Sequence, residues 1–365
     1  MSTKQRNAYC PDYVVPPGQI LEEHLEARGI KKTTLAALCG LTGKTISQII
    51  SGKAPVTADL ALQLQRILGT SAELWCNLEA NYRLDLARQQ ERKKLTGQEQ
   101  WAKAFPIVEL VRRGVMAKPE TPAGRAAAVL AFFGAGSPAA WDRHYAQMAV
   151  NFRRSATLKS NEPAVAAWLR IGELRAKAIA APAYDETRFK EALTTIREMT
   201  AKVPADFSPR LRKLCLAAGV VLVFEPELKG TSLSGATRWL KDTPLIMLSL
   251  RHKSDDHFWF SFFHEAGHII RHGKKLTFID LSGQPSQDPL EQEADQFAAD
   301  FLISPKGYAA FVAAGQFSEA AIQRFAKEAG IAAGIVVGRL QNDKKLPWGT
   351  PCNRLKRKVD FAPKA

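Results

Sequence analysis

Apolar positions recur at helical spacing along most of the chain and form short continuous runs in one region. Before residue 205, helices are predicted over 17–25, 33–39, 44–51, 57–69, 71–88, 123–133, 138–149, 162–179 and 185–201. Strands are predicted over 220–224, 231–240 and 245–250, and later helices over 290–302, 319–329 and 332–341. The fold class expected is a mainly α N-terminal bundle with a helical connector, followed by an α+β domain with a small sheet.

Two short helices around a glycine-containing turn stand out near the N-terminus. The helix 33–39, with Thr33 as its expected N-cap, is followed by the turn 40–43 and the helix 44–51. This arrangement is typical of a helix-turn-helix, whose second helix presents small and polar side chains to the major groove. The candidate DNA contacts are Thr33, Thr34, Thr42, Lys44, Thr45, Ser47, Gln48 and Lys53.

The charge around these helices supports a nucleic-acid partner. Between Arg28 and Ala58 the chain has five basic residues and no acidic one. Lys53 follows the second helix, where it could reach a phosphate. The alternative is a small helical bundle with a solvated basic face, but helices, turn and basic side coincide here, which favours DNA binding.

The motif His264-Glu265-Ala266-Gly267-His268 follows an apolar run that predicts a buried helix. Residues four apart lie one above the other on a helix, so both imidazoles can address one Zn²⁺, with Glu265 beside them as general base. The alternative is a core helix with two internally hydrogen-bonded histidines. It leaves unexplained a buried carboxylate, which is costly without a partner.

A catalytic zinc site has a third protein ligand and an open position. Glu293 is the predicted third ligand, because it lies next to Ala294 and one turn before Phe297 on the apolar stripe of the helix 290–302. A charge at a helix N-terminus is its alternative role. His272 continues the four-residue series, but Gly273 indicates that the helix ends there and that His272 points elsewhere.

The motifs from 219 to 299 together resemble the ImmA/IrrE metallopeptidases over roughly residues 205–345. They are the run 219–223, Ser234-Gly235-Ala236, the run 245–249, the block 264–273 and Glu293-Ala294-Asp295-Gln296-Phe297-Ala298-Ala299. The resemblance implies a zincin-like domain in which His264, His268 and Glu293 bind zinc and Glu265 is the catalytic base. Asp295 stands where the family often has Asn, and Ser304-Pro305 where it often has Met-Pro.

The N-terminal motifs resemble the HigA-like antitoxin branch of the Xre/Cro helix-turn-helix family over roughly residues 14–88. They include Pro17-Gly18, Gly40-Leu41, the run 49–53, the run 68–75 and the run 77–82. The resemblance implies a homodimer that binds double-stranded operator DNA and represses its own operon, often beside a toxin partner. Thr34 stands where the family often has Gln, a residue that usually helps to hold the DNA backbone.

The strand 231–240 is expected at a sheet edge beside the zinc helix, where a peptide substrate could add as an extra strand. Gly235 is expected to allow close approach of another backbone, and Arg238 is the candidate for binding a substrate carbonyl. The segment 346–365 is expected to be a basic surface tail. The domains predicted are 14–88, 89–204 and 205–345, with the tail last.

Composition narrows the setting. The formal net charge of +15 suits a polyanion, but most of the excess lies outside the helix-turn-helix, where a solvated basic surface is favoured over non-specific attraction to DNA. Five scattered cysteines without a C-x-x-C pair argue for a reducing cytoplasm and against cysteine-ligated zinc. No apolar run is long enough for a membrane helix, and no signal peptide is evident.

The sequence therefore predicts an antitoxin-like transcriptional repressor with a zinc-dependent endopeptidase domain of the gluzincin-like HExxH type. The peptidase would hydrolyse a bond in a protein or peptide substrate, either a regulator or the chain itself. The alternative is a repressor whose zinc domain is a non-catalytic sensor or a toxin-binding module.

Overall fold

The computed structural model describes residues 15–153, 161–204, 206–249, 251, 254–274, 277–281 and 288–359. The chain forms two compact units: Met1–Glu99 with Thr121–Ala126, and Gln100–Glu120 with Ala127–Ala365. None of the described helices combines the length and the apolar character needed to cross a bilayer.

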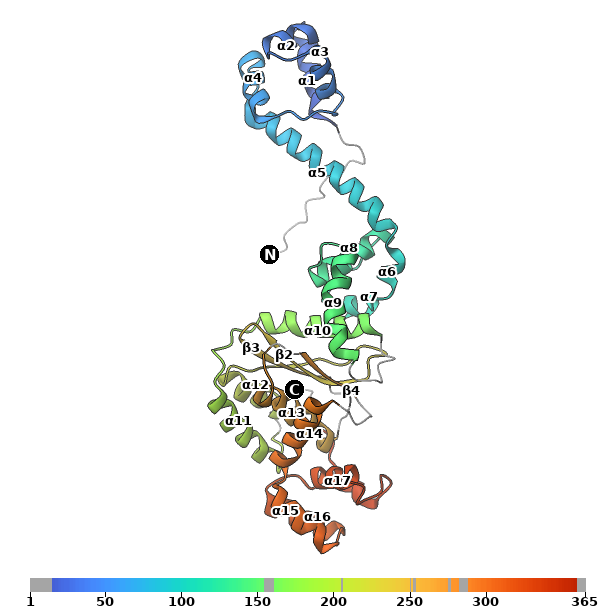
Figure 1. The fold of residues 1–365 in the computed structure, drawn as a ribbon, viewed down its shortest axis with the longest axis vertical. Coiled ribbons are helices and arrows are strands. Elements are labelled where there is room, and N and C mark those ends of the chain that lie inside the picture. The colour runs from blue at the N-terminus through green and yellow to red at the C-terminus, as the bar shows by residue number, and fades with distance from the viewer. Residues whose placement is uncertain are drawn as a thin grey trace. The chain divides into compact units, whose positions relative to one another are not determined.

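The first unit is a bundle of α1 (Pro17–Ala27), α2 (Lys32–Leu38), α3 (Gly43–Ile50), α4 (Ala58–Leu68) and the long α5 (Ala72–Thr96), labelled in Figure 1. Its core is formed by side chains without exposed surface: Leu21, Leu35, Ile46, Leu64 and Trp75. The hydroxyls of Thr42, Thr57 and Ser71 cap α3, α4 and α5 by accepting backbone N–H groups. The predicted periodicity is thus present, and α5 continues through the polar stretch 86–96 as a helix.

The expected N-cap at Thr33 is wrong. The helix α2 begins at Lys32, and its N-cap is Lys31, whose side chain makes no capping hydrogen bond. The Lys31 carbonyl already accepts the N–H of Leu35 at 3.0 Å, so Thr33 lies inside the first turn. This frees the Thr33 hydroxyl from a capping role and leaves it exposed.

The second unit is built around a four-stranded mixed sheet. Its strands are β1 (Val221–Phe224), β2 (Leu233–Leu240), β3 (Thr243–Leu248) and β4 (Thr277–Leu281), in the order β1-β3-β2-β4. β1 runs parallel to β3, and β2 runs antiparallel to both β3 and β4. The expectation that 231–240 forms an edge strand is therefore wrong: β2 is an inner strand, and β4, which the sequence did not reveal, is the edge beside it.

Helices cover both faces of this sheet (Figure 1). The helices that follow α5 along the chain are α6 (Glu99–Lys103), α7 (Ile107–Arg112), α8 (Pro122–Phe133), α9 (Pro138–Arg153), α10 (Glu162–Lys177), α11 (Glu186–Met199), α12 (Phe207–Ala217), α13 (Asp255–Arg271), α14 (Pro289–Leu302), α15 (Pro305–Ala314), α16 (Glu319–Ala329) and α17 (Ala333–Asn342). On one face α10 packs Trp168 over Val221 and Met247. On the other α13 packs Trp259 and Phe262 under Leu222 and Ile246. Alternate strand residues serve the two layers, as the pleat requires.

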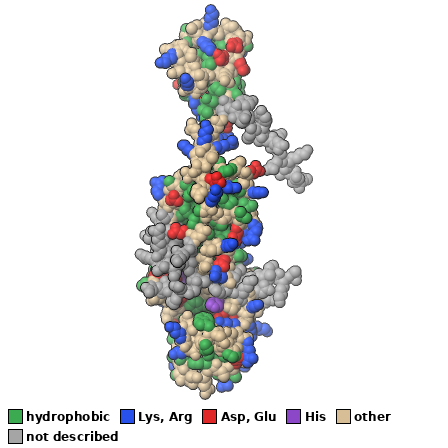
Figure 2. Space-filling view, turned by 90° about the vertical axis from the view of Figure 1, so that its right-hand side faces the viewer, with side chains coloured by type: hydrophobic (Ala, Val, Ile, Leu, Met, Phe, Trp, Pro, Cys, Tyr) green, Lys and Arg blue, Asp and Glu red, His purple; other side chains and the backbone are tan. Residues whose placement is uncertain are grey.

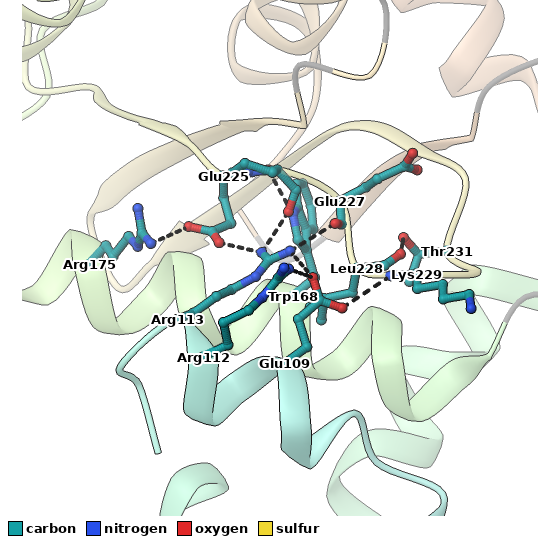
Figure 3. Close-up of polar contacts among 11 residues, drawn as sticks. Glu109, Arg112, Arg113, Trp168, Arg175, Glu225, Glu227, Leu228, Lys229 and Thr231 are labelled. Carbon is teal, nitrogen blue, oxygen red and sulfur yellow. Dashed lines mark hydrogen bonds and ion pairs between the residues drawn. The ribbon is translucent and has the colours of Figure 1, made fainter. Parts of the chain in front are cut away.

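A buried ion-pair cluster ties α7 and α10 to the end of β1 (Figure 3). The fully buried Glu225 pairs with Arg113 at 2.5 Å and with Arg175 at 2.7 Å, and its carbonyl accepts the indole N–H of Trp168 at 3.0 Å. Arg113 also pairs with Glu109. Removing one partner of such a buried pair costs about 3–5 kcal/mol. These contacts hold α7 and α10, which lie in the expected connector, against the end of β1.

The C-terminal segment packs against the start of α13. A 3-10 helix, Pro351–Leu355, buries Cys352, and Val359 is buried after it. Lys356 Nζ lies 2.5 Å from Asp256 Oδ2, and the backbone N–H of Arg357 donates to Asp255 Oδ1 at 3.0 Å. The expected surface tail is thus wrong for 351–359, and residues 360–365 lie outside the described part of the chain.

Asp255 makes this contact sensitive to pH. Burial, and the neighbouring charge of Asp256, raise the pKa of Asp255 from 3.8 to about 6, against the two backbone N–H groups that favour its charged form. Between pH 4 and 6 the unfolded chain therefore loses this proton before the folded chain does, and the contribution of Asp255 to stability falls as the pH rises.

We therefore expect Asp255→Asn to raise the free energy of unfolding of the second unit at pH 7.5 by about 1–2 kcal/mol. A pKa difference of two units corresponds to about 3 kcal/mol. An amide N–H₂ placed at Oδ2, which has no hydrogen-bond partner among the residues that the structure describes, subtracts part of this. Urea unfolding at pH 4 and pH 7.5 measures the effect, with Asp242→Asn, a 91% exposed side chain, as control. A difference between wild type and Asp255→Asn that is the same at both pH values would contradict the raised pKa.

Candidate metal centre and nucleic-acid interface

The helix α13 carries the HExxH residues through the core of the second unit. It starts after the extended Ser254, with Asp255 and Asp256 in its first turn, where carboxylates favour a helix N-terminus. His264, Glu265 and His268 have exposed fractions of 3%, 0% and 1%. Polar side chains that are buried to this extent need hydrogen-bond or ion-pair partners from neighbouring elements.

Three ligand atoms of the kind that binds zinc converge here. His264 Nε2 lies 3.1 Å from His268 Nε2 and 3.1 Å from Glu291 Oε2, and His268 Nε2 lies 3.4 Å from the same carboxylate oxygen. Such ligand atoms of the three residues all lie within 4.8 Å of one another. Two imidazoles and one carboxylate are the protein ligands of one class of catalytic zinc site, which leaves a position open.

Glu291 thus occupies the place that the sequence analysis gave to Glu293. On α14, Glu291, Ala294, Asp295 and Ala298 follow the i, i+3, i+4, i+7 pattern, and both alanines are fully buried against α13. Glu293 points away from this stripe, and its side chain is 60% exposed. The position of Glu293 one turn before Phe297 did not identify the face of α14 that packs against α13, because Phe297 lies at the margin of this packing and is only partly buried.

The pKa values of the two histidines are shifted in opposite directions. Burial alone would lower the pKa of His264, but its hydrogen bonds with Asp295 and Glu291 raise that pKa well above its ordinary value. Burial lowers the pKa of His268 to about 4. The pKa of Glu291 falls to about 2, despite burial, because both imidazoles bond it. The centre therefore favours an ionised carboxylate and added positive charge.

Glu265 is held by the neighbouring strand β2. Thr237 Oγ1 donates to Glu265 Oε2 at 2.6 Å, and a Cβ atom at Gly235 would lie only 2.3 Å from Glu265 Oε1. Burial is the main cause that raises the pKa of Glu265 well above its ordinary value. Glu265 Oε1 is buried and has no hydrogen-bond partner among the described residues. A buried carboxylate oxygen without a partner is unusual and points to a reacting group or ligand that would supply one.

Gly235 admits a side chain, not the backbone that the sequence analysis expected. Arg238 lies on the face of the sheet opposite to the candidate metal centre. Successive residues of a strand face opposite sides, so Gly235 and Thr237 face α13 whereas Arg238 faces α10. There its guanidinium pairs with Glu173, which makes it a poor candidate for binding substrate.

Several residues of the site were not predicted as such. Asp295 accepts or shares a proton with His264 Nδ1 at 2.8 Å, and on β4 Asp280 stands opposite Gly235 and Phe278 opposite Thr237. The spacing of Glu291 and Asp295, four residues apart beside two alanines, is the sequence signal that could have found both. The helix α13 ends at Arg271, and His272 lies outside the triad, where its Nδ1 is 2.9 Å from His268 Nδ1.

The first unit presents most of the candidate DNA contacts on its surface. Ile46, Ile49 and Ile50 anchor α3 in the core, while exposed side chains comprise Thr33, Thr34, Thr42, Lys44, Ser47, Gln48 and Lys53. Thr45 is partly buried and shares a 2.9 Å hydrogen bond with Thr42. On the face shown in Figure 2, Lys and Arg side chains are spread over both units and do not gather into one patch.

Comparison with known proteins matches the two ends of the chain to different families. Residues 21–75 match the helix-turn-helix family, and residues 215–341 match the peptidase M78 family, described as an IrrE N-terminal-like domain. Virulence-associated protein I of Dichelobacter nodosus is 36% identical over 20% of this chain and 70% of its own length. An uncharacterised HTH-type transcriptional regulator of Escherichia coli, YddM, is 30% identical over 17% of this chain and 67% of its own length.

Among solved structures, the Pseudomonas aeruginosa antitoxin HigA with higBA promoter is 31% identical over 22% of this chain and 90% of that chain, with a TM-score of 0.22. An addiction module antidote protein of a HigA family from Coxiella burnetii is 32% identical over 22% of this chain and 89% of that chain, with a TM-score of 0.21. Through residues 21–75 the chain belongs to the helix-turn-helix family, and in residues 215–341 it carries an IrrE N-terminal-like domain of the peptidase M78 family.

Proposed function

We propose that the chain is a DNA-binding transcriptional repressor of the antitoxin type whose second unit is a zinc-dependent endopeptidase. The peptidase hydrolyses a bond in a regulator or in the chain itself. One observation carries the enzymatic part: Glu265, which has a buried oxygen without a hydrogen-bond partner in the described part of the chain, follows His264 on the helix that supplies two members of the triad. A site that served only to hold a metal would have no need of this carboxylate.

The donor set fits zinc, because two imidazole nitrogens and one carboxylate oxygen are the protein ligands of one class of catalytic zinc site. When bound, the ion supplies Lewis-acid polarisation of the scissile carbonyl and lowers the pKa of water. The residues would supply the rest. His264, His268 and Glu291 would hold the ion, Thr237 fixes Glu265 Oε2, and Glu265 Oε1 would take the proton from the attacking water and return it to the leaving amine.

The regulatory part rests on the helix-turn-helix. The exposed face of α3 offers Gln48, which can pair with adenine, and small side chains that fit close to base edges. Of the relatives in Dichelobacter nodosus and Escherichia coli, the second is named as a transcriptional regulator. We extend this to a homodimer on double-stranded operator DNA in the cytoplasm, with a possible toxin partner. The functional segments proposed are 14–88 for DNA, 89–204 as connector and 205–345 for proteolysis.

Substitutions on α3 should separate specificity from affinity. Gln48→Ala is expected to cost about 1–3 kcal/mol at one base position, because it removes a base-edge contact. Lys53→Ala is expected to weaken all sequences alike and to reduce the salt slope of binding by about one, because it removes a phosphate contact. Fluorescence anisotropy of the full chain on the DNA upstream of its own gene and on shuffled DNA measures both. Equal affinity of the wild type for the two DNAs would refute the repressor proposal.

The peptidase proposal is tested on the same purified chain. Zinc-loaded protein is incubated alone and with a lysate of its host, and mass spectrometry identifies new chain ends that a chelator suppresses. Binding of zinc and operator DNA without any new chain end, under conditions that relieve repression in cells, would favour a sensor or a toxin-binding module instead.

A further inference from the structure

The ring of His268 makes a second polar contact on the edge that faces away from the triad. Its Nδ1 lies 2.9 Å from Nδ1 of His272, and Nε2 of His272 lies 3.2 Å from Glu293 Oε2. The side chains of His268 and His272 are 1% and 3% exposed, whereas that of Glu293 is 60% exposed. A line of three polar side chains thus leads from the candidate metal centre to the surface of α14.

We propose that His272 and Glu293 form a relay that orients His268 for metal binding, an inference that rests on the proposed zinc site. We call the three residues His268, His272 and Glu293 the histidine relay. A metal-binding histidine usually donates its other ring N–H to a carboxylate, carbonyl or water, and this partner fixes the tautomer and the plane of the ring. In the relay the acceptor is another histidine, which is itself held by a carboxylate.

The relay admits one arrangement of protons when both histidines are neutral. His268 must keep Nε2 free for the metal, so its proton is on Nδ1 and is donated to His272 Nδ1. His272 must then carry its proton on Nε2, which donates to the ionised Glu293. With this arrangement each imidazole N–H of the histidine relay donates to an acceptor, and His268 Nε2 stays free for the metal.

Packing keeps the two rings in place. Phe278 of β4 stacks on His268 with ring centroids 3.9 Å apart and 14° between the planes, and it also contacts His272 at 5.0 Å. His272 follows the last residue of α13 in an extended conformation, which turns its side chain back toward His268.

The two candidate ligands are therefore oriented by different means. His264 meets the carboxylate of Asp295 directly at 2.8 Å, whereas His268 meets the carboxylate of Glu293 through His272. Both carboxylates come from α14. This gives Glu293 a role outside the ligand set.

The test is the zinc affinity of the full chain with two matched substitutions of His272. His272→Asn places an amide oxygen close to the position of Nδ1 and keeps the acceptor, while His272→Phe keeps an aromatic ring against Phe278 and removes it. The relay predicts that Phe lowers zinc affinity by about 10- to 100-fold and that Asn retains affinity within about threefold. Competition with a chromogenic chelator measures both values, and thermal unfolding checks the fold.

Other outcomes overturn the relay. If His272 served only for packing, Phe would retain the affinity and Asn would lose it. Equal affinities of wild type and both variants would also refute the relay while leaving the zinc site intact, whereas a wild type that holds no zinc would refute the proposed function itself.

Glu293→Gln supplies an independent arm. It keeps an acceptor oxygen but removes an exposed, screened charge, so it is expected to lower zinc affinity less than His272→Phe does. The control is Asp300→Asn on the same helix. A complete loss of zinc from Glu293→Gln would show Glu293 to be a ligand and would overturn the relay.

Discussion

Glu265→Gln is expected to lower the rate of peptide-bond cleavage by about 10²- to 10⁴-fold while the chain keeps its zinc and its fold. The amide has nearly the shape of the carboxylate and can still accept the hydrogen bond of Thr237, but it cannot take a proton from water. Single-turnover rates from the appearance of new chain ends, together with metal content, measure the effect.

The same variant separates an enzyme from a sensor inside cells. It is expected to bind operator DNA as the wild type does and to remain a repressor under conditions that relieve wild-type repression. The matched control is Thr237→Ser, which retains the hydroxyl beside Glu265 and should retain cleavage. Normal relief of repression by Glu265→Gln would mean that the zinc domain senses or binds without catalysis.

Zinc content is expected to respond sharply to which carboxylate of α14 is changed. His264→Ala, His268→Ala and Glu291→Gln should each reduce bound zinc from about one ion per chain to nearly none, because a site with three protein ligands does not survive the loss of one. Glu293→Gln should keep the ion through dialysis, with lower affinity. Elemental analysis after dialysis against a weak chelator measures all four.

Asp300→Asn serves as the control for a carboxylate of α14 outside the centre. The reverse pattern, in which Glu293→Gln releases zinc and Glu291→Gln keeps it, would restore the ligand set expected from the sequence. The experiment thus tests the metal site and also which face of α14 is turned toward α13.

Sequence periodicity was a sound guide wherever a helix had one clearly apolar face. The helices around the turn 40–43 and the buried helix with His264 and His268 were predicted in this way, and α13 ends near Gly273 as expected. Local rules succeed here because helix formation, caps and the spacing of residues four apart depend on near neighbours.

No local rule could have placed Glu291, rather than Glu293, beside the two histidines. Glu291, Glu293 and Asp295 lie within one and a half turns, and only the rotation of α14 against α13 decides which of them faces the histidines. The small alanines at 294 and 298 set this rotation, because they let the two helices approach closely.

Structural features that depend on contacts between residues distant in sequence could not be predicted either. The five-residue β4 became an edge strand by pairing with β2, and α10 joined the sheet through Glu225 and Trp168. The segment 351–359 is ordered by Asp255 and Asp256, which are distant in sequence. Each of these depends on contacts between residues that the sequence does not bring together.

Gly235 gives the candidate site an unusual vulnerability. Because a Cβ atom there would lie 2.3 Å from Glu265 Oε1, an alanine at this position would compete with the carboxylate for the same space. The ligand triad lies on α13 and α14 and would be untouched. For the proposed zinc peptidase, one added methyl group on an inner strand would thus displace the proposed base while the proposed metal ligands stay in place, which would give a chain of this architecture a one-step evolutionary route from proteolysis to sensing.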